Sequence, residues 1–313
     1  MAASKRIVVC GGGGFLGSRI CKSAVARGWD VTSIKYEFPQ GVAVLPFIQR
    51  KVLTNTHHSR SGEPDWSTIT SSSSPPPWAR KVAWERADIL KPSTYSPLLK
   101  NADYVVHSMG ILLEADYKGI ISGKESPISG LQRAFSSAKG GSQNPLTRKR
   151  DEDLKPQEKD GQLTYELMNR DSAITLAREA YAESVPAFAY ISAAAGAPVL
   201  PARYIETKRE AESTIAREFP NMRSVFARPP FLYDSSRAIT MPLAMMIGAG
   251  AVFNSVTGGI FNGLMGAAGT KPLKADLVAE AVVEALGDDK TKGPVELKEI
   301  EELAQKGWRK GML

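Results

Sequence analysis

Residues 11–17, Gly-Gly-Gly-Gly-Phe-Leu-Gly, constrain the fold of this chain more than any other feature. The apolar run Arg6–Cys10 precedes them, and residues 18–28 continue with apolar side chains at helical spacing. This pattern predicts a strand, a tight turn and a helix. Gly11, Gly14 and Gly17 have the spacing with which a backbone approaches a pyrophosphate, while the helix N-terminus presents N–H groups to it. The turn therefore predicts a dinucleotide site.

The second strand, predicted at Asp30–Ile34, carries no acidic residue at its end to bind a ribose 2′-hydroxyl. Residues 35–58 have no place in a strand–helix–strand unit, and without them Ile34 joins Ser59-Arg60-Ser61. A basic, hydroxyl-bearing loop suits a 2′-phosphate, so we predict NADP rather than NAD, with Arg60 as the residue that reads it. The segment 35–58 is either an insertion or an untranslated segment retained in the coding sequence.

Further strands are predicted at 82–90, 102–110 and 187–192, separated by helical or polar segments. Strands that alternate with helices indicate an α/β fold with a doubly wound parallel sheet. We expect a dinucleotide-binding domain over residues 1–236, with insertions at 35–58 and 115–162. Residues 237–313 are expected to form a small C-terminal region on the substrate side, with an apolar lid and a closing helix.

Tyr204 and Lys208 stand one helical turn apart, so they share a helix face. An ammonium beside a phenol stabilises the ionised phenol, and this geometry predicts a lowered pKa for Tyr204, as a general acid needs. The preceding strand ends in Ser192-Ala193-Ala194. Ser192 is the candidate hydroxyl, although it stands one position early.

The chain resembles the extended or atypical short-chain dehydrogenases/reductases, the NAD-dependent epimerase/dehydratase-like proteins with a Rossmann fold. The resemblance spans most of the chain outside the two insertions. It implies that Tyr204 passes a proton to or from the substrate, that Lys208 holds the nicotinamide ribose and that a serine orients the substrate. Because Ala193 occupies the usual serine position, turnover is expected to be weak or absent. The matching pieces are Gly11 to Gly17, Asp88-Ile89, residues 105–108, Tyr165 to Asn169, Ser192, Tyr204 with Lys208, Arg228-Pro229-Pro230 and residues 274–279.

The resemblance extends these expectations to particular residues. The expected catalytic residues are Tyr204, Lys208 and Ser192. The expected dinucleotide-binding residues are Gly11, Gly14, Phe15, Leu16, Gly17, Arg60, Asp88, Ile89, Lys208 and Arg228.

Within this superfamily the chain most resembles mitochondrial complex I accessory subunits and fungal coenzyme Q biosynthesis proteins. That resemblance implies a role on the matrix side of the mitochondrial inner membrane, acting in or assembling quinone metabolism; otherwise the protein is cytoplasmic. Two alternatives remain open. One is a non-catalytic scaffold subunit that keeps its nucleotide, and the other is a reductase or epimerase of a soluble sugar nucleotide or small carbonyl compound.

Charge and composition limit the classes of binding partner that we expect. The chain has 40 Lys and Arg against 33 Asp and Glu, a net charge of +7. A phosphorylated cofactor is a sufficient anionic partner for this charge, so we expect no nucleic-acid partner. The 3 histidines and 2 cysteines show no metal-ligand spacing, and we expect no metal.

Residues 238–270 carry no charge and are expected to form either a lid over an apolar molecule such as a quinone or a hairpin in peripheral contact with a membrane. The first strand begins near Lys5, which leaves no room for a cleavable presequence.

Overall fold

The computed structural model describes ten stretches of the chain. Arg60, most of 35–58 and of 115–162, and the uncharged stretch 238–270 lie outside them, so the expectations placed there are not addressed. The described residues are 4–36, 62–64, 66–70, 72–110, 145–147, 149, 152–155, 164–194, 202–234 and 271–312.

A seven-stranded sheet forms the centre of the structure, in the order β3-β2-β1-β4-β5-β6-β9, with every neighbouring pair parallel. β7 (Leu232–Tyr233) and β8 (Leu273–Lys274) make a separate parallel pair. This arrangement confirms the predicted doubly wound α/β fold. The main strands are β1 (Arg6–Cys10), β2 (Asp30–Tyr36), β3 (Val82–Ala87), β4 (Tyr104–His107), β5 (Ala187–Ile191), β6 (Arg223–Ala227) and β9 (Gly293–Val295).

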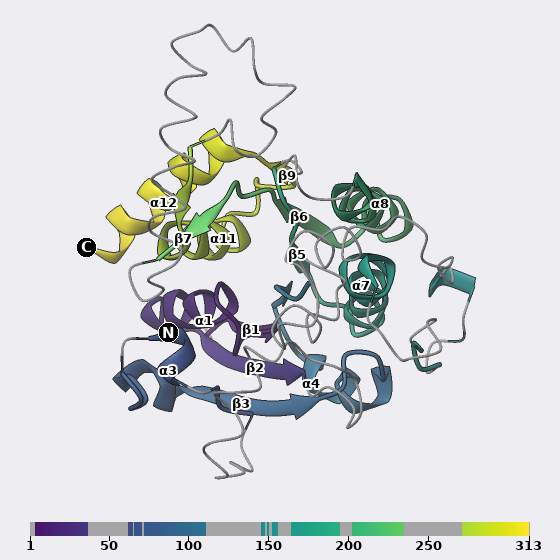
Figure 1. The fold of residues 1–313 in the computed structure, drawn as a ribbon, viewed down its shortest axis with the longest axis horizontal. Helices are drawn as coiled ribbons and strands as arrows, with labels where there is room; N and C mark the ends of the chain where they lie inside the picture. The colour runs from purple at the N-terminus through teal and green to yellow at the C-terminus, as the bar shows by residue number, and fades with distance from the viewer. Residues whose placement is uncertain are drawn as a thin grey trace, which may run out of the picture.

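Helices cover both faces of the sheet, as Figure 1 shows. One face carries α1 (Gly17–Ala26), α11 (Ala275–Gly287) and α12 (Leu297–Gly311). The other carries α4 (Ser96–Leu99), α7 (Ser172–Ala182) and α8 (Ala202–Glu218). The shorter elements are α3 (Trp66–Ile69), the 3₁₀ turns η1 (Pro77–Lys81), η2 (Pro92–Thr94) and η3 (Pro145–Thr147), and the π-helical turn η4 (Glu166–Asp171).

Two hydrophobic cores follow from this layering. Side chains alternate along β1, so that Ile7 and Val9 pack into the core beneath α1 and α11, while Val8 and Cys10 pack into the core beneath α7. All four are fully buried, which explains why this strand is an uninterrupted apolar run. None of the described helices is long and apolar enough to cross a membrane.

β2 is longer than the sequence predicts. Lys35 and Tyr36, expected to begin the inserted segment, continue the strand and pair with Arg86 and Ala87 of β3. The strand continues because β3 offers it hydrogen-bond partners beyond Ile34. Lys35 therefore belongs to the sheet and stands at the edge where the site is formed.

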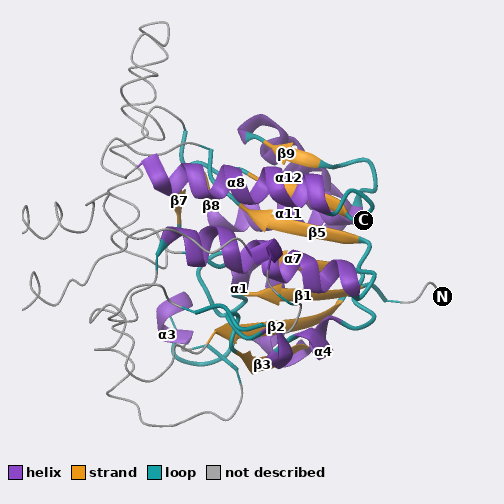
Figure 2. Cartoon of the chain, turned by 90° about the vertical axis from the view of Figure 1, so that its right-hand side faces the viewer, coloured by secondary structure: helices purple, strands orange, loops and turns teal. Residues whose placement is uncertain are grey.

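The parallel strands bring their carboxyl ends to one edge of the sheet (Figure 2). The glycine turn follows β1, Asp88 follows β3, and Ser108 follows β4 at this edge. Ser192 follows β5 and Arg228 follows β6 there. The predicted site residues that are described thus lie on or beside one edge, as expected for a ligand crevice in an open α/β sheet.

Candidate functional site

The glycine turn has the tight geometry that its sequence predicts. Gly11 adopts φ +88°, and its N–H donates to the carbonyl of Ile34 in β2 at 2.9 Å. The Gly14 N–H donates back to the Gly11 carbonyl at 2.8 Å. A Cβ on Gly17 would lie 2.1 Å from that same carbonyl oxygen, so the start of α1 can approach β1 this closely only with glycine there.

The beginning of α1 is suited to an anion. Leu16, at the N-cap position, provides no side-chain hydrogen bond to the helix, and the first turn contains no acidic residue. The positive end of the helix dipole therefore meets no carboxylate within its own first turn. Gly14 is exposed above this helix end, where a pyrophosphate would approach.

Other predicted dinucleotide contacts are placed as follows. Phe15 is half-buried, with the Arg19 guanidinium 4.5 Å from its ring centroid, and Leu16 is buried. Asp88 accepts a hydrogen bond from the Leu90 N–H at 3.0 Å, and burial raises the pKa of its carboxyl. Ile89 is fully buried and lines the core.

Tyr204 and Lys208 share one side of α8, as predicted. The Lys208 Nζ lies 5.7 Å from the Tyr204 ring centroid and donates to the carbonyl of Ile191 at 3.0 Å. Burial lowers the pKa of Lys208 to about 8. Burial likewise raises the pKa of Tyr204 to about 12, which is opposite to the predicted direction. The prediction was wrong because the ammonium binds a backbone carbonyl rather than the phenol oxygen, so desolvation dominates.

Polar groups from three elements meet beside Lys208. A Cβ on Gly110, after β4, would stand 2.9 Å from the Asn169 Oδ1 and 3.7 Å from the Lys208 Nζ. Asn169 is held in η4, where its carbonyl accepts a hydrogen bond from the Tyr190 hydroxyl. The Lys208 amine as donor and the Asn169 amide oxygen as acceptor, both close to Gly110, can together bind ribose hydroxyls.

His107, the last residue of β4, is buried beside this group. Its Nε2 lies 2.9 Å from the Ser172 Oγ, whose own hydrogen is donated to the Met168 carbonyl at 2.8 Å. The Nε2 must therefore carry the hydrogen and donate it. Burial, followed by the charge of Lys208, lowers the pKa of His107 to about 3, so the ring is neutral. This histidine fills the core as a hydrogen-bonded neutral side chain.

The structure changes the interpretation of Ser192. Its Oγ accepts a hydrogen bond from Arg209 Nη1 at 3.0 Å, and the side chain is buried. The hydroxyl is thus tied to α8 through a residue that does not belong to the predicted site. Ala193 provides no hydroxyl in its place. Ser192 is therefore better assigned to holding the segment after β5 than to catalysis.

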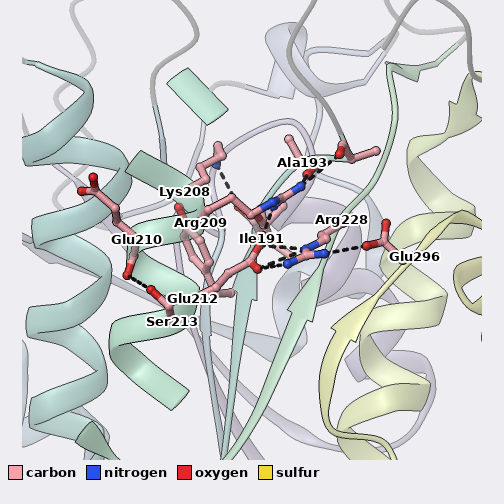
Figure 3. A network of polar contacts seen from close by, with 12 residues as sticks. Ile191, Ala193, Lys208, Arg209, Glu210, Glu212, Ser213, Arg228 and Glu296 are labelled. Atoms are coloured by element: carbon pink, nitrogen blue, oxygen red, sulfur yellow. Dashed lines mark hydrogen bonds and ion pairs between the residues drawn. The ribbon is translucent and has the colours of Figure 1, made fainter. Parts of the chain in front are cut away.

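Arg228, predicted to bind the dinucleotide, is engaged by two carboxylates. Its guanidinium binds both carboxylate oxygens of Glu212 and donates to Glu296 at 2.6 Å (Figure 3). These carboxylates raise the pKa of Arg228 further above its usual value. A role for Arg228 in dinucleotide binding stays a prediction, and the structure adds that two carboxylates distant in sequence hold its guanidinium.

Sequence reasoning missed Arg209 and Glu212. Arg209 binds Ser192, two backbone carbonyls and Glu212, and Glu212 is only 5% exposed at its side chain. The available signal was an arginine directly after Lys208 with a glutamate three residues on, a spacing that places them together on a helix. Ion pairs at this spacing are common on surfaces, so the pattern alone does not reveal a site.

A seven-stranded parallel sheet with a glycine turn after β1 and a Tyr–Lys pair on the helix after β5 is the arrangement expected from the resemblance to extended or atypical short-chain dehydrogenases/reductases. The chain belongs to the family of MIOREX complex component 2 of Saccharomyces cerevisiae, with which it shares 34% identity over 245 residues. That alignment covers 74% of this chain and 74% of the yeast protein. No protein-family model matches the chain.

Solved structures with a similar course of the chain are sugar-nucleotide epimerases. UDP-glucuronic acid 4-epimerase from Bacillus cereus, solved with NAD, has 15% identity and a TM-score of 0.48, covering 93% of this chain and 76% of that one. The UDP-Glc/GlcNAc 4-epimerase of Campylobacter jejuni has 13% identity and a TM-score of 0.47, covering 96% and 82%.

The low pKa of Lys208 predicts a pH-dependent stability difference. Because the pKa of about 8 in the folded state lies below the ordinary lysine value of 10.5 in the unfolded chain, the folded state loses its proton first and the wild type gains stability as pH rises between those values. Lys208→Met cannot titrate. Its unfolding free energy relative to wild type should therefore fall by about 2 kcal/mol from about pH 7.5 to about pH 9.5. Urea unfolding of both proteins at the two pH values measures this, and a constant difference would contradict it.

Proposed function

We propose that this protein binds a nicotinamide dinucleotide at the carboxyl edge of its sheet and serves as a dinucleotide-bound component of a mitochondrial protein complex. The observation that carries the proposal is that two groups of residues lie at this edge, each suited to one half of a dinucleotide. The glycine turn and the α1 N-terminus supply the pyrophosphate half. Lys208 and Asn169, adjacent to Gly110, supply the ribose half.

The same edge lacks part of the machinery for hydride transfer. Ala193 has no hydroxyl, and the Ser192 hydroxyl is bound to Arg209. Burial raises the pKa of the Tyr204 phenol to about 12, further from neutral pH, which makes it a weaker proton donor. A nicotinamide ring bound here would supply a hydride donor or acceptor, but the described residues after β5 present one fewer group to orient and polarise a substrate carbonyl. A binding role therefore fits these residues better than rapid turnover.

The assembly role rests on the relative. The yeast protein is named as a component of the MIOREX complex, and we extend this kind of role to the present chain. The resemblance to mitochondrial complex I accessory subunits supports a mitochondrial location on the matrix side of the inner membrane. After gentle solubilisation of mitochondria, the tagged protein is expected to elute well above its monomer mass of 33.8 kDa. Elution only as a monomer would argue against the assembly role.

We infer a preference for NADP over NAD. Lys35, at the end of β2, stands where a reader of the adenosine ribose is expected, and its Cγ lies 3.9 Å from the position of a Cβ on Gly13. A cation at this position favours a 2′-phosphate. In calorimetric titrations NADPH should bind about tenfold more tightly than NADH, and Lys35→Glu should remove this preference. Equal affinities in the wild type would overturn the NADP assignment and leave dinucleotide binding intact.

A redox role toward a quinone or another apolar molecule is the second candidate. The observation that favours it is the retention of both Tyr204 and Lys208 on one side of α8, with the ammonium 5.7 Å from the phenol ring. The test is oxidation of NADPH by the purified protein with a short-chain ubiquinone analogue. Turnover that depends on Tyr204 would favour this candidate, and its absence would favour the assembly role.

A further inference from the structure

Arg209 makes three hydrogen bonds to residues 192–194, the described segment after β5. Its Nη1 donates to the Ser192 Oγ at 3.0 Å, and its Nη2 donates to the carbonyls of Ala193 and Ala194 at 2.7 and 3.0 Å. Figure 3 shows the guanidinium directed at this segment from α8. Three successive residues are thus held by one planar, rigid group.

Neighbouring interactions complete the hold on this segment. The N–H groups of Ser192 and Ala194 donate to the carbonyls of Ala227 and Pro229, at 2.8 and 2.9 Å. The carbonyl of Ile191 accepts from Lys208. Lys208 and Arg209 therefore bind four consecutive residues, 191–194. The same set of hydrogen bonds fixes the position of the Lys208 amine and the path of this segment.

A buried carboxylate holds Arg209 in this orientation. Glu212 accepts from Arg209 Nη1 at 2.7 Å and also binds Arg228, which in turn binds Glu296 at the N-cap of α12. These four side chains form a series of ion pairs that extends from the site edge to α12, on the other face of the sheet. Because Arg228 keeps Glu212 paired when Arg209 is changed, losing the Arg209 contacts does not leave an unpaired buried charge.

We propose that Arg209 is a positioning residue, which holds residues 192–194 and Lys208 in the arrangement that receives the nicotinamide half of the dinucleotide. This inference rests on the proposed dinucleotide binding. Arg209 contacts no residue of the glycine turn, so its effect is confined to one half of the site. The adenine and pyrophosphate half is bound independently of it.

The test compares NADPH with ADP, which contains the adenine and pyrophosphate but no nicotinamide ribose. Arg209→Lys keeps the positive charge, yet an ammonium cannot reach the Ser192 hydroxyl and both carbonyls in one fixed plane. We expect its affinity for NADPH to fall about tenfold and its affinity for ADP to stay within about twofold of wild type. Arg217→Lys, an exposed substitution on the same helix, should change neither.

Hydrogen exchange in the ligand-free protein provides a second readout that does not depend on binding. The amides of Ser192 and Ala194 should exchange faster in Arg209→Lys than in Arg217→Lys, while β1 stays as protected as in wild type. Equal losses of NADPH and ADP affinity would indicate a general structural role and overturn the proposal. Unchanged NADPH affinity, or unchanged exchange at residues 192–194, would overturn it as well. A wild type that binds neither molecule would instead overturn the proposed function and, with it, the positioning role.

Discussion

Gly14→Val is expected to lower the affinity for NADPH by a factor on the order of a hundred while the protein keeps its fold. Gly14 is exposed above the turn, and among the described residues a Cβ there would have one neighbour within 4 Å, the Gly11 carbonyl oxygen at 3.1 Å. This contact is tight, so the turn must give slightly, and the added methyl groups would occupy the space through which the pyrophosphate approaches. Calorimetric titration measures the affinity, and thermal unfolding followed by circular dichroism checks the fold.

Gly17→Ala provides the contrast. Its Cβ would lie 2.1 Å from the Gly11 carbonyl oxygen and 2.6 Å from the Ser108 Oγ, so the turn must shift. We expect a loss of stability of roughly 2 kcal/mol or more, visible as a lower Tm without any ligand. If Gly14→Val binds NADPH as tightly as wild type does, the pyrophosphate does not lie over this turn, and the proposed site is wrong.

Substitutions of Lys208 and of Tyr204 are expected to have different effects on dinucleotide binding. Lys208→Met should weaken NADPH binding by a factor on the order of fifty, because the amine that faces Gly110 is lost from the ribose half of the site. Tyr204→Phe removes only a hydroxyl whose pKa burial raises to about 12, and we expect its NADPH affinity to stay close to that of wild type. Titration of the two variants under identical conditions makes the comparison.

Tyr204→Phe and Gly14→Val together discriminate between an assembly role and an enzyme in cells. If the protein acts as a dinucleotide-bound component, Tyr204→Phe should support normal complex assembly and normal quinone levels, whereas Gly14→Val should not. A reductase would lose roughly a hundredfold of its rate in Tyr204→Phe, because the proton donor is gone. Loss of quinone production in Tyr204→Phe with assembly intact would therefore overturn the assembly proposal in favour of the enzyme.

The sequence alone determined the features that depend on local spacing. The three glycines after an apolar run predicted the turn and the start of α1, because Gly11 takes a positive φ and a Cβ on Gly17 would collide with the Gly11 carbonyl. The spacing of Tyr204 and Lys208 predicted a shared helix face, since residues four apart are neighbours on any α-helix. The alternation of strands with helices predicted a parallel sheet, whose carboxyl ends must meet at one edge.

The tertiary structure decided every property that depends on a distant partner or on burial. Arg228 binds Glu212 and Glu296, which lie 16 and 68 residues away, so no local pattern shows that its guanidinium is engaged. The pKa of Tyr204 moved upward because folding buries the phenol and directs the Lys208 amine to a carbonyl. β2 extends through Lys35 and Tyr36 because β3 pairs with them. Helix and strand periodicity places a side chain on a face, but the partner it meets there depends on how the layers pack.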